Sequence, residues 1–312
     1  DIKNGIYGGE EMIKNFDELL LAVKNNKTMK LAVAAAQDKE VLEAVNSAAK
    51  MKLVEPVLVG DEAAIRNIMD DINMADKYRI IHEPDVIQSA KIAVSLVREG
   101  KADFLMKGIL QTADIMRAVL DKEAGLRTDS LISHVMVYQV PSYHKLLFLT
   151  DGGINVAPDL EQKVKILENA ISVCKAMGLS KIYASVLAGA ETVNVKIPAT
   201  VDADALSNMH DKWSKLDTVV EGPVALDLAI SKEACEHKKY KGEGGGNADI
   251  LLVPYYEVGN ALGKSLTYFA DSKSAGIIMG AKAPIVLVSR ADTSETKLLS
   301  IAMGSIIAKN IK

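Results

Sequence analysis

The chain has little cysteine, few aromatic residues and no excess of basic charge. Its 312 residues include only two cysteines, Cys174 and Cys235, which make no disulfide framework and fit a reducing cytoplasm. Aromatic residues make up 4%, so no stacking platform for nucleobases is evident, and the net charge of −4 argues against a nucleic-acid partner. No apolar run approaches the roughly 18 residues of a membrane span, and no signal peptide is recognisable. We expect a cytoplasmic protein with no membrane or nucleic-acid partner.

Several sequence signatures of cofactor and metal sites are also missing. No Walker A motif is present, and the glycine-rich stretch Gly242–Asn247 lacks the third glycine of a dinucleotide-binding motif and follows lysines rather than a strand. The five histidines are scattered, with no paired His or Cys at metal-binding spacing. We therefore expect no metal and no bound cofactor.

Short apolar runs alternate with longer amphipathic ones along almost the whole chain. This alternation predicts an α/β fold with mostly parallel sheets, and the length favours about two domains. The predicted strands are 30–35, 54–59, 79–82, 104–107, 135–140, 146–150, 182–187, 218–220, 250–253 and 285–288. The predicted helices are 13–27, 38–51, 61–74, 85–98, 112–121, 160–177, 224–235 and 293–309.

Two places depart from this alternation. Only five residues separate the strands 135–140 and 146–150, so they should form an antiparallel hairpin, and a domain change is expected near residue 130. Residues 1–11 show no periodicity, and Gly-Gly-Glu-Glu before Met12 is what a purine-rich ribosome-binding site would encode. We expect Met12 to be the natural start and residues 1–11 to be leader residues.

The segment from Ala283 to Thr296 reads as a buried strand, a polar elbow and the start of a helix. The backbone N–H groups of a helix N-terminus favour an anion, and the fork of Arg290 suits phosphate oxygens. Ser289 adds a hydroxyl, and Asp292 and Glu295 add carboxylates that could move a proton. The alternative interpretation is structural, because Asp292 with Glu295 three residues later is also a good N-cap pair.

Three other strand ends carry polar candidates. Lys107 and Gly108 form a second strand–helix elbow, followed by Thr112 and Arg117, and the alternative here is a surface lysine followed by a capping threonine. Asp151-Gly-Gly-Ile-Asn155 and Glu257-Val-Gly-Asn260 follow other strands, where open α/β sheets bind ligands, although plain turns explain them equally well.

Together these segments resemble the phosphate acetyl/butyryltransferase family. The resemblance runs from about Met29 to the C-terminus, and its specificity lies in the order and spacing of its anchors. The anchors are Thr112-Ala-Asp-Ile-Met-Arg117, Leu149-Thr-Asp151-Gly-Gly-Ile-Asn155, Val220-Glu-Gly-Pro-Val-Ala-Leu-Asp227, Ala248-Asp-Ile-Leu-Leu-Val-Pro254, Gly259-Asn260 and Ser289-Arg290.

The resemblance implies the reversible reaction of acyl-CoA and inorganic phosphate to acyl phosphate and free CoA, with no further cofactor. It implies two α/β/α domains of the isocitrate/isopropylmalate-dehydrogenase type with the active-site cleft between them. The first domain would span residues 12–130 and 290–312, and the second, inserted domain residues 131–289. It also implies a homodimer or larger homo-oligomer, and it makes Ser289 and Arg290 catalytic.

Two departures point to the butyryl branch of the family. The acetyl branch places an essential aspartate six residues after the arginine, where this chain has Thr296, so Asp292 or Glu295 would have to replace it. The acetyl branch also carries a basic segment ahead of its Thr-Ala-Asp helix, which this chain lacks, and Lys107 is the expected replacement.

The predicted mechanism is direct transfer in a ternary complex, since no Cys or Ser lies in a recognisable nucleophile motif. Arg290 and Lys107 would hold phosphate, Ser289 would hydrogen-bond the thiol or acyl oxygen, and Asp292 would act as base, with butyryl-CoA or a similar short-chain acyl-CoA as substrate. Gly108, Thr112, Arg117, Asp151, Asn155 and Asn260 complete the predicted phosphate- and substrate-binding set.

The first alternative is acetyl-CoA as the preferred substrate. Another is a metal- and NAD-dependent decarboxylating dehydrogenase of the same fold, for which Asp202 and Asp204 stand close together without further matching carboxylates. The last is a non-catalytic CoA-binding protein, against which the intact Ser289-Arg290 pair argues.

Overall fold

The structure is a computed structural model that describes residues 12–311 except 76, 288, 290 and 291. The chain divides into two compact units. We call Phe16–Ile132 with Ser274–Lys312 the terminal unit, and Ser133–Lys273 with the few residues before Phe16 the inserted unit. The leader residues expected at 1–11 lie outside the described part of the chain.

The two units differ from the expected domains mainly at their second boundary. The sequence places it at residue 290, whereas the units divide after Lys273, before most of strand β10 (Lys273–Met279). The reason is pairing: β10 is antiparallel to β11 (Ile285–Val286), and β11 pairs with β4 (Phe104–Lys107) of the terminal unit.

In the terminal unit the strands of the sheet follow the order β3-β2-β1-β4-β11-β10. Its remaining strands are β1 (Met29–Ala34), β2 (Val54–Gly60) and β3 (Arg79–His82). All these neighbours are parallel except β10 and β11. The predicted parallel α/β architecture is confirmed, and β10 is a strand that the sequence analysis missed.

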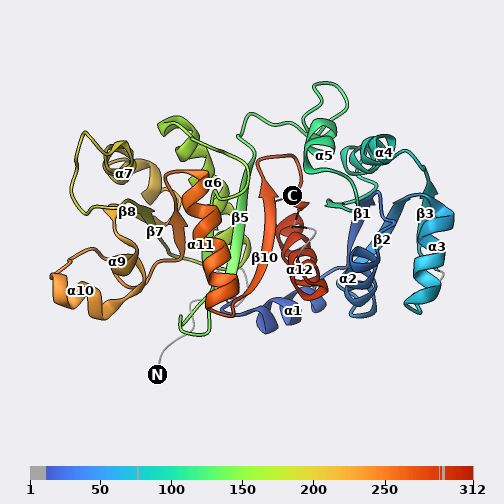
Figure 1. Cartoon of the computed structure of the whole chain (residues 1–312), viewed down its shortest axis with the longest axis horizontal. Helices are drawn as coiled ribbons and strands as arrows, with labels where there is room; N and C mark the ends of the chain where they lie inside the picture. Colours follow the sequence, from blue (N-terminus) through green and yellow to red (C-terminus); the bar gives the residue numbers. More distant parts are fainter. Residues whose placement is uncertain (1–11, 76, 288, 290–291, 312) are drawn as a thin grey trace. The chain divides into compact units, whose positions relative to one another are not determined.

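Helices cover both faces of this sheet (Figure 1). They are α1 (Phe16–Lys24), α2 (Lys39–Lys50), α3 (Glu62–Asp71), α4 (Val86–Arg98), α5 (Thr112–Val119) and α12 (Ser294–Asn310). Helix α12 packs against α1 and α2, and α4 packs against α5. Asp38, Asp61 and Asp85 cap α2, α3 and α4 by accepting first-turn N–H groups, which is why these helices begin where the sequence predicts.

The inserted unit contains strands in the order β5-β6-β9-β7-β8. Their bounds are β5 (Ser133–Gln139), β6 (Leu147–Thr150), β7 (Ile182–Leu187), β8 (Thr218–Val224) and β9 (Ile250–Leu252). The predicted antiparallel hairpin is confirmed, since Val137 pairs with Phe148 across β5 and β6. The other pairs are parallel.

Six helices belong to the inserted unit, and several differ from the prediction. They are α6 (Leu160–Ala176), α7 (Pro198–Ser207), α8 (His210–Ser214), α9 (Leu226–Ile230), α10 (Lys232–Lys238) and α11 (Tyr256–Phe269). The single helix predicted over 224–235 is wrong, because Ser231 has extended backbone that ends α9 and caps α10. Helices α7, α8 and α11 were not predicted.

The core of this unit follows the alternation of its strands. Leu149 and Leu251, on neighbouring strands, join an apolar cluster that includes Leu262 and Leu266 of α11. Phe148 and Ile250, one residue away, point to the other face, where α6 packs. In the part of the chain that the structure describes, no helix is long and apolar enough to span a bilayer.

Candidate functional site

Three neighbouring strands of the terminal unit end at the same edge of the sheet. Ala34 of β1 pairs with Lys107 of β4, and Val286 of β11 pairs with Met106. Because these strands are parallel, the segments that follow β1, β4 and β11 leave from one edge. The Lys107 and Ser289 elbows both belong to this edge, as the sequence analysis expected of strand–helix connections.

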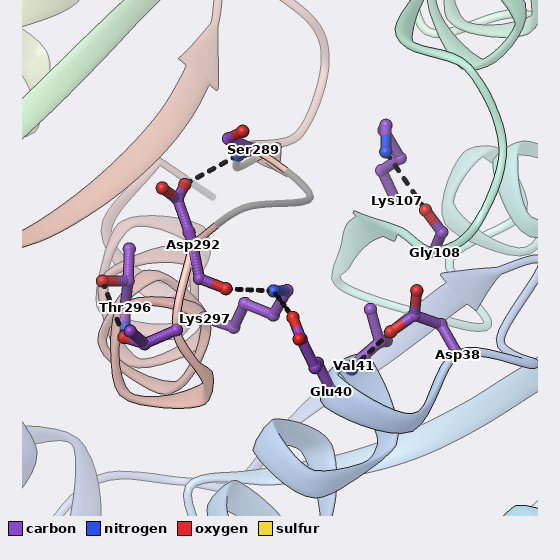
Figure 2. Close-up of polar contacts among 10 residues, drawn as sticks. Asp38, Glu40, Val41, Lys107, Gly108, Ser289, Asp292, Thr296 and Lys297 are labelled. Carbon is purple, nitrogen blue, oxygen red and sulfur yellow. Dashed lines mark hydrogen bonds and ion pairs between the residues drawn. The ribbon is translucent and has the colours of Figure 1, made fainter. Parts of the chain in front are cut away.

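Lys107 is buried rather than exposed at this edge. The residue is 7% accessible, and its Nζ donates to the Gly108 carbonyl at 3.1 Å (Figure 2). The interpretation of Lys107 as a surface lysine is therefore wrong. A buried ammonium is costly unless polar or anionic groups surround it, and the Gly108 carbonyl is one such group.

Gly108 brings this elbow against the end of β1. Its N–H donates to the Ala34 carbonyl at 2.8 Å, and the N–H of Ile109 donates to the Ala35 carbonyl at 2.9 Å. A Cβ at Gly108 would lie 2.1 Å from the Ala35 carbonyl oxygen. Only glycine fits here, and its N–H is already used within the protein.

Thr112 and Arg117 both lie exposed on α5. Thr112 is the first helical residue, and the N-cap is Gln111, which makes no side-chain cap bond. The capping role considered for Thr112 is therefore wrong. Arg117 donates to Asp114 at 2.7 Å with a side chain that is 71% exposed, so this ion pair contributes little to stability.

Two hydrogen bonds join Ser289 and Asp292 just before α12, and we call this contact the Ser289–Asp292 turn. The Ser289 N–H donates to Asp292 Oδ2 at 2.7 Å (Figure 2). The Asp292 N–H donates to the Ser289 carbonyl at 3.1 Å. Arg290 lies outside the described residues.

The N-cap of α12 is Thr293, whose hydroxyl accepts the Thr296 N–H at 3.2 Å. The cap pair proposed for Asp292 and Glu295 is wrong, because the Asp292 carboxylate turns back to Ser289; Glu295 is exposed in the first turn.

Lys297 is a residue of this region that the sequence analysis missed. Its side chain is 4% exposed, and its Nζ donates to Glu40 Oε2 at 2.8 Å and to the Asp292 carbonyl (Figure 2). Glu40 lies in the first turn of α2, so this contact joins two helices that are far apart in sequence. A lysine inside the apolar run of α12 was the available signal.

A second polar group lies in the inserted unit, after β6. The Asp151 carboxylate accepts the N–H groups of Gly153 at 2.8 Å and Ile154 at 2.9 Å, and the Asn155 side-chain amide at 2.6 Å. Asp151 is 3% accessible. Its oxygens are therefore engaged in organising the 151–155 loop.

Asn260, on the first turns of α11, lies beside this loop. Its side-chain amide is 3.4 Å from the Gly152 carbonyl. A Cβ at Gly152 would lie 2.6 Å from the Gly259 backbone, so the two glycines allow this close approach. The structure thus brings Asp151, Asn155 and Asn260 together within the inserted unit.

Burial sets the protonation of the two cysteines. Desolvation raises the pKa of the fully buried Cys174 thiol well above its ordinary value, and it also raises the pKa of Cys235. Because the thiolate is the reactive form, neither cysteine is suited to carry an acyl group.

A hollow of about 660 Å³ in the terminal unit lies away from these elbows. Lys122, Arg127, Thr128, Asp129 and Lys282 line it. Lys282 lies between β10 and β11, so it belongs to the edge where β11 begins, opposite the edge where Ser289 follows it. The hollow is not part of the candidate site.

The described residues also bear on the dehydrogenase alternative. Among them, no group of three or more His, Cys, Asp or Glu residues is arranged to hold a metal ion. Asp202, one of the two carboxylates considered for that role, is engaged with Lys163 at 2.6 Å.

Comparison with known proteins identifies the family. The family described as phosphate acetyl/butaryl transferase matches residues 80–305. The chain belongs to this family of acyltransferases. It is 45% identical over 300 residues to the phosphate butyryltransferase of Clostridium acetobutylicum, covering 96% of this chain and 100% of that protein. It is 40% identical over 293 residues to the phosphate acetyltransferase of Thermotoga maritima, covering 94% and 100%.

A solved structure shares both the family and the fold. The crystal structure of a branched-chain phosphotransacylase from Enterococcus faecalis V583 matches with a TM-score of 0.80 and 35% identity, covering 89% of this chain and 99% of that one. The predicted α/β class and the resemblance to the family are confirmed.

Proposed function

We propose that this chain transfers a short-chain acyl group reversibly between CoA and phosphate, with butyryl-CoA or a similar short-chain acyl-CoA as substrate and no further cofactor. Two relatives support this choice: one is named a phosphate butyryltransferase at 45% identity and another a branched-chain phosphotransacylase at 35%. The structural observation that carries the proposal is the buried Lys107 ammonium at the edge where the Ser289–Asp292 turn also lies.

The proposed roles divide between phosphate and the acyl-CoA. Lys107 and Arg290 hold phosphate through their positive charge. Gly108 contributes by its close packing, since its N–H is already used. The exposed Thr112 and Arg117 bind the anionic CoA, and the loop that Asp151 organises presents Asn155 and Asn260 to a substrate.

In the direction that consumes acyl phosphate, the CoA thiol must first lose its proton. A thiol with a pKa of about 8.5 is mostly protonated near neutrality, so a base is needed, and we assign this role to Asp292. The thiolate attacks the acyl carbon, the C–S bond forms, and the C–O bond to phosphate breaks. Ser289 hydrogen-bonds the thiol or the acyl oxygen, while Arg290 and Lys107 take up the charge of the departing phosphate.

Direct transfer is preferred to an acyl-enzyme. The raised pKa of both cysteine thiols removes the strongest candidate nucleophiles, and Ser289 lies in no recognisable nucleophile motif. Holding both substrates together then supplies much of the rate enhancement.

The test is phosphate-dependent release of CoA thiol from acetyl-, butyryl- and branched acyl-CoA. Two additional buried methylenes are worth about 1.6 kcal/mol, so kcat/KM for butyryl-CoA should exceed that for acetyl-CoA by roughly 15-fold. Arg290→Ala should lower kcat by about 10²–10³-fold while the fold is kept. A preference for acetyl-CoA would support the first alternative, and thiol release without phosphate, or NAD reduction in the control assay, would refute the proposal.

We also propose a homodimer or larger homo-oligomer and a cytoplasmic location. The first rests on the family resemblance, and light scattering coupled to gel filtration measures it. The second rests on the two free cysteines, which fit a reducing compartment.

A further inference from the structure

Lys297 lies where a buried cation is electrostatically disfavoured. It is in the first turns of α12, and its partner Glu40 is in the first turn of α2. The N-terminal end of a helix carries partial positive charge and prefers anions. The Lys297 side chain is nevertheless 4% exposed, whereas that of Glu40 is 56% exposed.

Stability alone is a poor explanation for this lysine. Burying the ammonium costs desolvation and side-chain entropy, and the solvated carboxylate of Glu40 returns only part of that cost. The distinctive contact is the other one: Nζ donates to the carbonyl of Asp292, the last residue of the Ser289–Asp292 turn. The buried ammonium of Lys297 therefore contacts the last residue of the candidate catalytic turn.

We propose that Lys297 is a positioning residue that fixes the Ser289–Asp292 turn for the transfer reaction. This inference rests on the proposed function. The turn is closed internally by the two hydrogen bonds between Ser289 and Asp292. Lys297 ties Asp292 to α2 through Glu40, and so holds in place the residue whose carboxylate contacts Ser289.

The variants are Lys297→Met, Lys297→Arg and Glu40→Gln, with Lys309→Met as the matched control. Lys309 lies at the far end of the same helix, and its Nζ donates to Asn26 at 2.8 Å. Lys297→Met should lower kcat by about 10–100-fold, the scale of a small misplacement of catalytic groups, with KM for phosphate and acyl-CoA within about threefold of wild type. Lys297→Arg, which keeps the charge and donors, should restore most of kcat.

Glu40→Gln should lower kcat less than Lys297→Met does, because the lysine can still donate to the Asp292 carbonyl. Lys309→Met should leave kcat unchanged. Equal losses of kcat in Lys297→Met and Lys309→Met would show a general effect of helix stability and overturn the proposal. A raised KM for phosphate with unchanged kcat would make Lys297 a direct phosphate ligand and would also overturn it.

Hydrogen exchange supplies a readout that does not depend on activity. The Ser289 amide donates to Asp292, so peptides covering the turn should exchange faster in Lys297→Met than in wild type, and Lys309→Met should match wild type there. If the wild-type protein transfers no acyl group, the proposed function fails while this measurement still tests the positioning contact. Unchanged exchange in Lys297→Met refutes the positioning itself.

Discussion

Gly108 offers the sharpest test of how the Lys107 elbow is built. In Gly108→Ala, the new Cβ would lie 2.1 Å from the Ala35 carbonyl oxygen and 2.6 Å from that of Ala34. Both neighbours are backbone atoms of the chain leaving β1, so no side chain can move aside to make room. The elbow itself must shift.

The size of that shift follows from the contact distance. Raising the Cβ–oxygen distance from 2.1 Å to at least 3.0 Å requires a separation of about 0.9 Å. The Gly108–Ala34 and Ile109–Ala35 hydrogen bonds, now 2.8 and 2.9 Å, would then exceed 3.5 Å. Each lost bond costs about 0.5–1.5 kcal/mol and the overpacking about 1–3 kcal/mol, so the unfolding free energy should fall by roughly 2–6 kcal/mol.

Thermal unfolding and the phosphate-dependent thiol assay measure the two consequences. Tm should fall by roughly 5–15 °C, and activity should fall further than stability explains at 25 °C, because Lys107 moves with the elbow. Gly189→Ala is the control, since a Cβ there meets nothing within 4 Å, and it should leave both quantities unchanged. A Gly108→Ala protein with wild-type Tm and activity would show that the elbow tolerates a Cβ at this position.

Three further predictions concern protonation and the polar loops. Asp292→Asn should abolish most turnover while Glu295→Gln retains it, as steady-state rates will show; the reverse pattern moves the base to Glu295. Because burial raises their pKa, Cys174 and Cys235 should stay protonated and unlabelled by a thiol reagent at pH 8 in the native protein, and both should react after denaturation; rapid native labelling would contradict their burial. Asp151→Asn places an amide against the N–H donors of its own loop, so the free energy of unfolding measured in urea should fall by about 1–3 kcal/mol. An unchanged free energy of unfolding would argue against the carboxylate as the organiser of the loop.

Strands and helices were predicted most reliably where an apolar run is bounded by capping residues. Strands β3, β4 and β7 match their predicted bounds because each contains a short apolar run, which is buried in β4 and mostly buried in β7. Strand β10 was missed because Lys273, Ser274 and Gly276 interrupt its apolar pattern, although all but its first residue are buried. Helix α11 was missed because Gly259 and Gly263 read as loop residues. Tertiary packing explains the glycine at position 259, because Gly259 packs against the Gly152 backbone.

The residues of the candidate site likewise include some that local sequence predicts and others that depend on tertiary packing. Lys107 and Ser289 were predictable because strand ends are recognisable, and the parallel pairing of β4 with β11 then brings both elbows to one edge. The contact between Lys297 and Glu40 was not predictable, because it depends on how α12 packs against α2. Local spacing also suggested the wrong cap, since a threonine one residue later competes equally well for the N-cap position.

The N-cap of α12 bears directly on the identity of the base. If Asp292 had capped α12, its carboxylate would face the N–H groups of the helix rather than Ser289. Thr293 takes that role instead, and Thr296, where the acetyl branch has its aspartate, completes the cap by donating its N–H to the Thr293 hydroxyl. Asp292 Oδ2 accepts the Ser289 N–H, so the carboxylate is held within the turn that carries the Ser289 hydroxyl. Glu295 is an exposed residue of the first turn, and the contact between Asp292 and Ser289 supports our proposal that Asp292 replaces the missing aspartate.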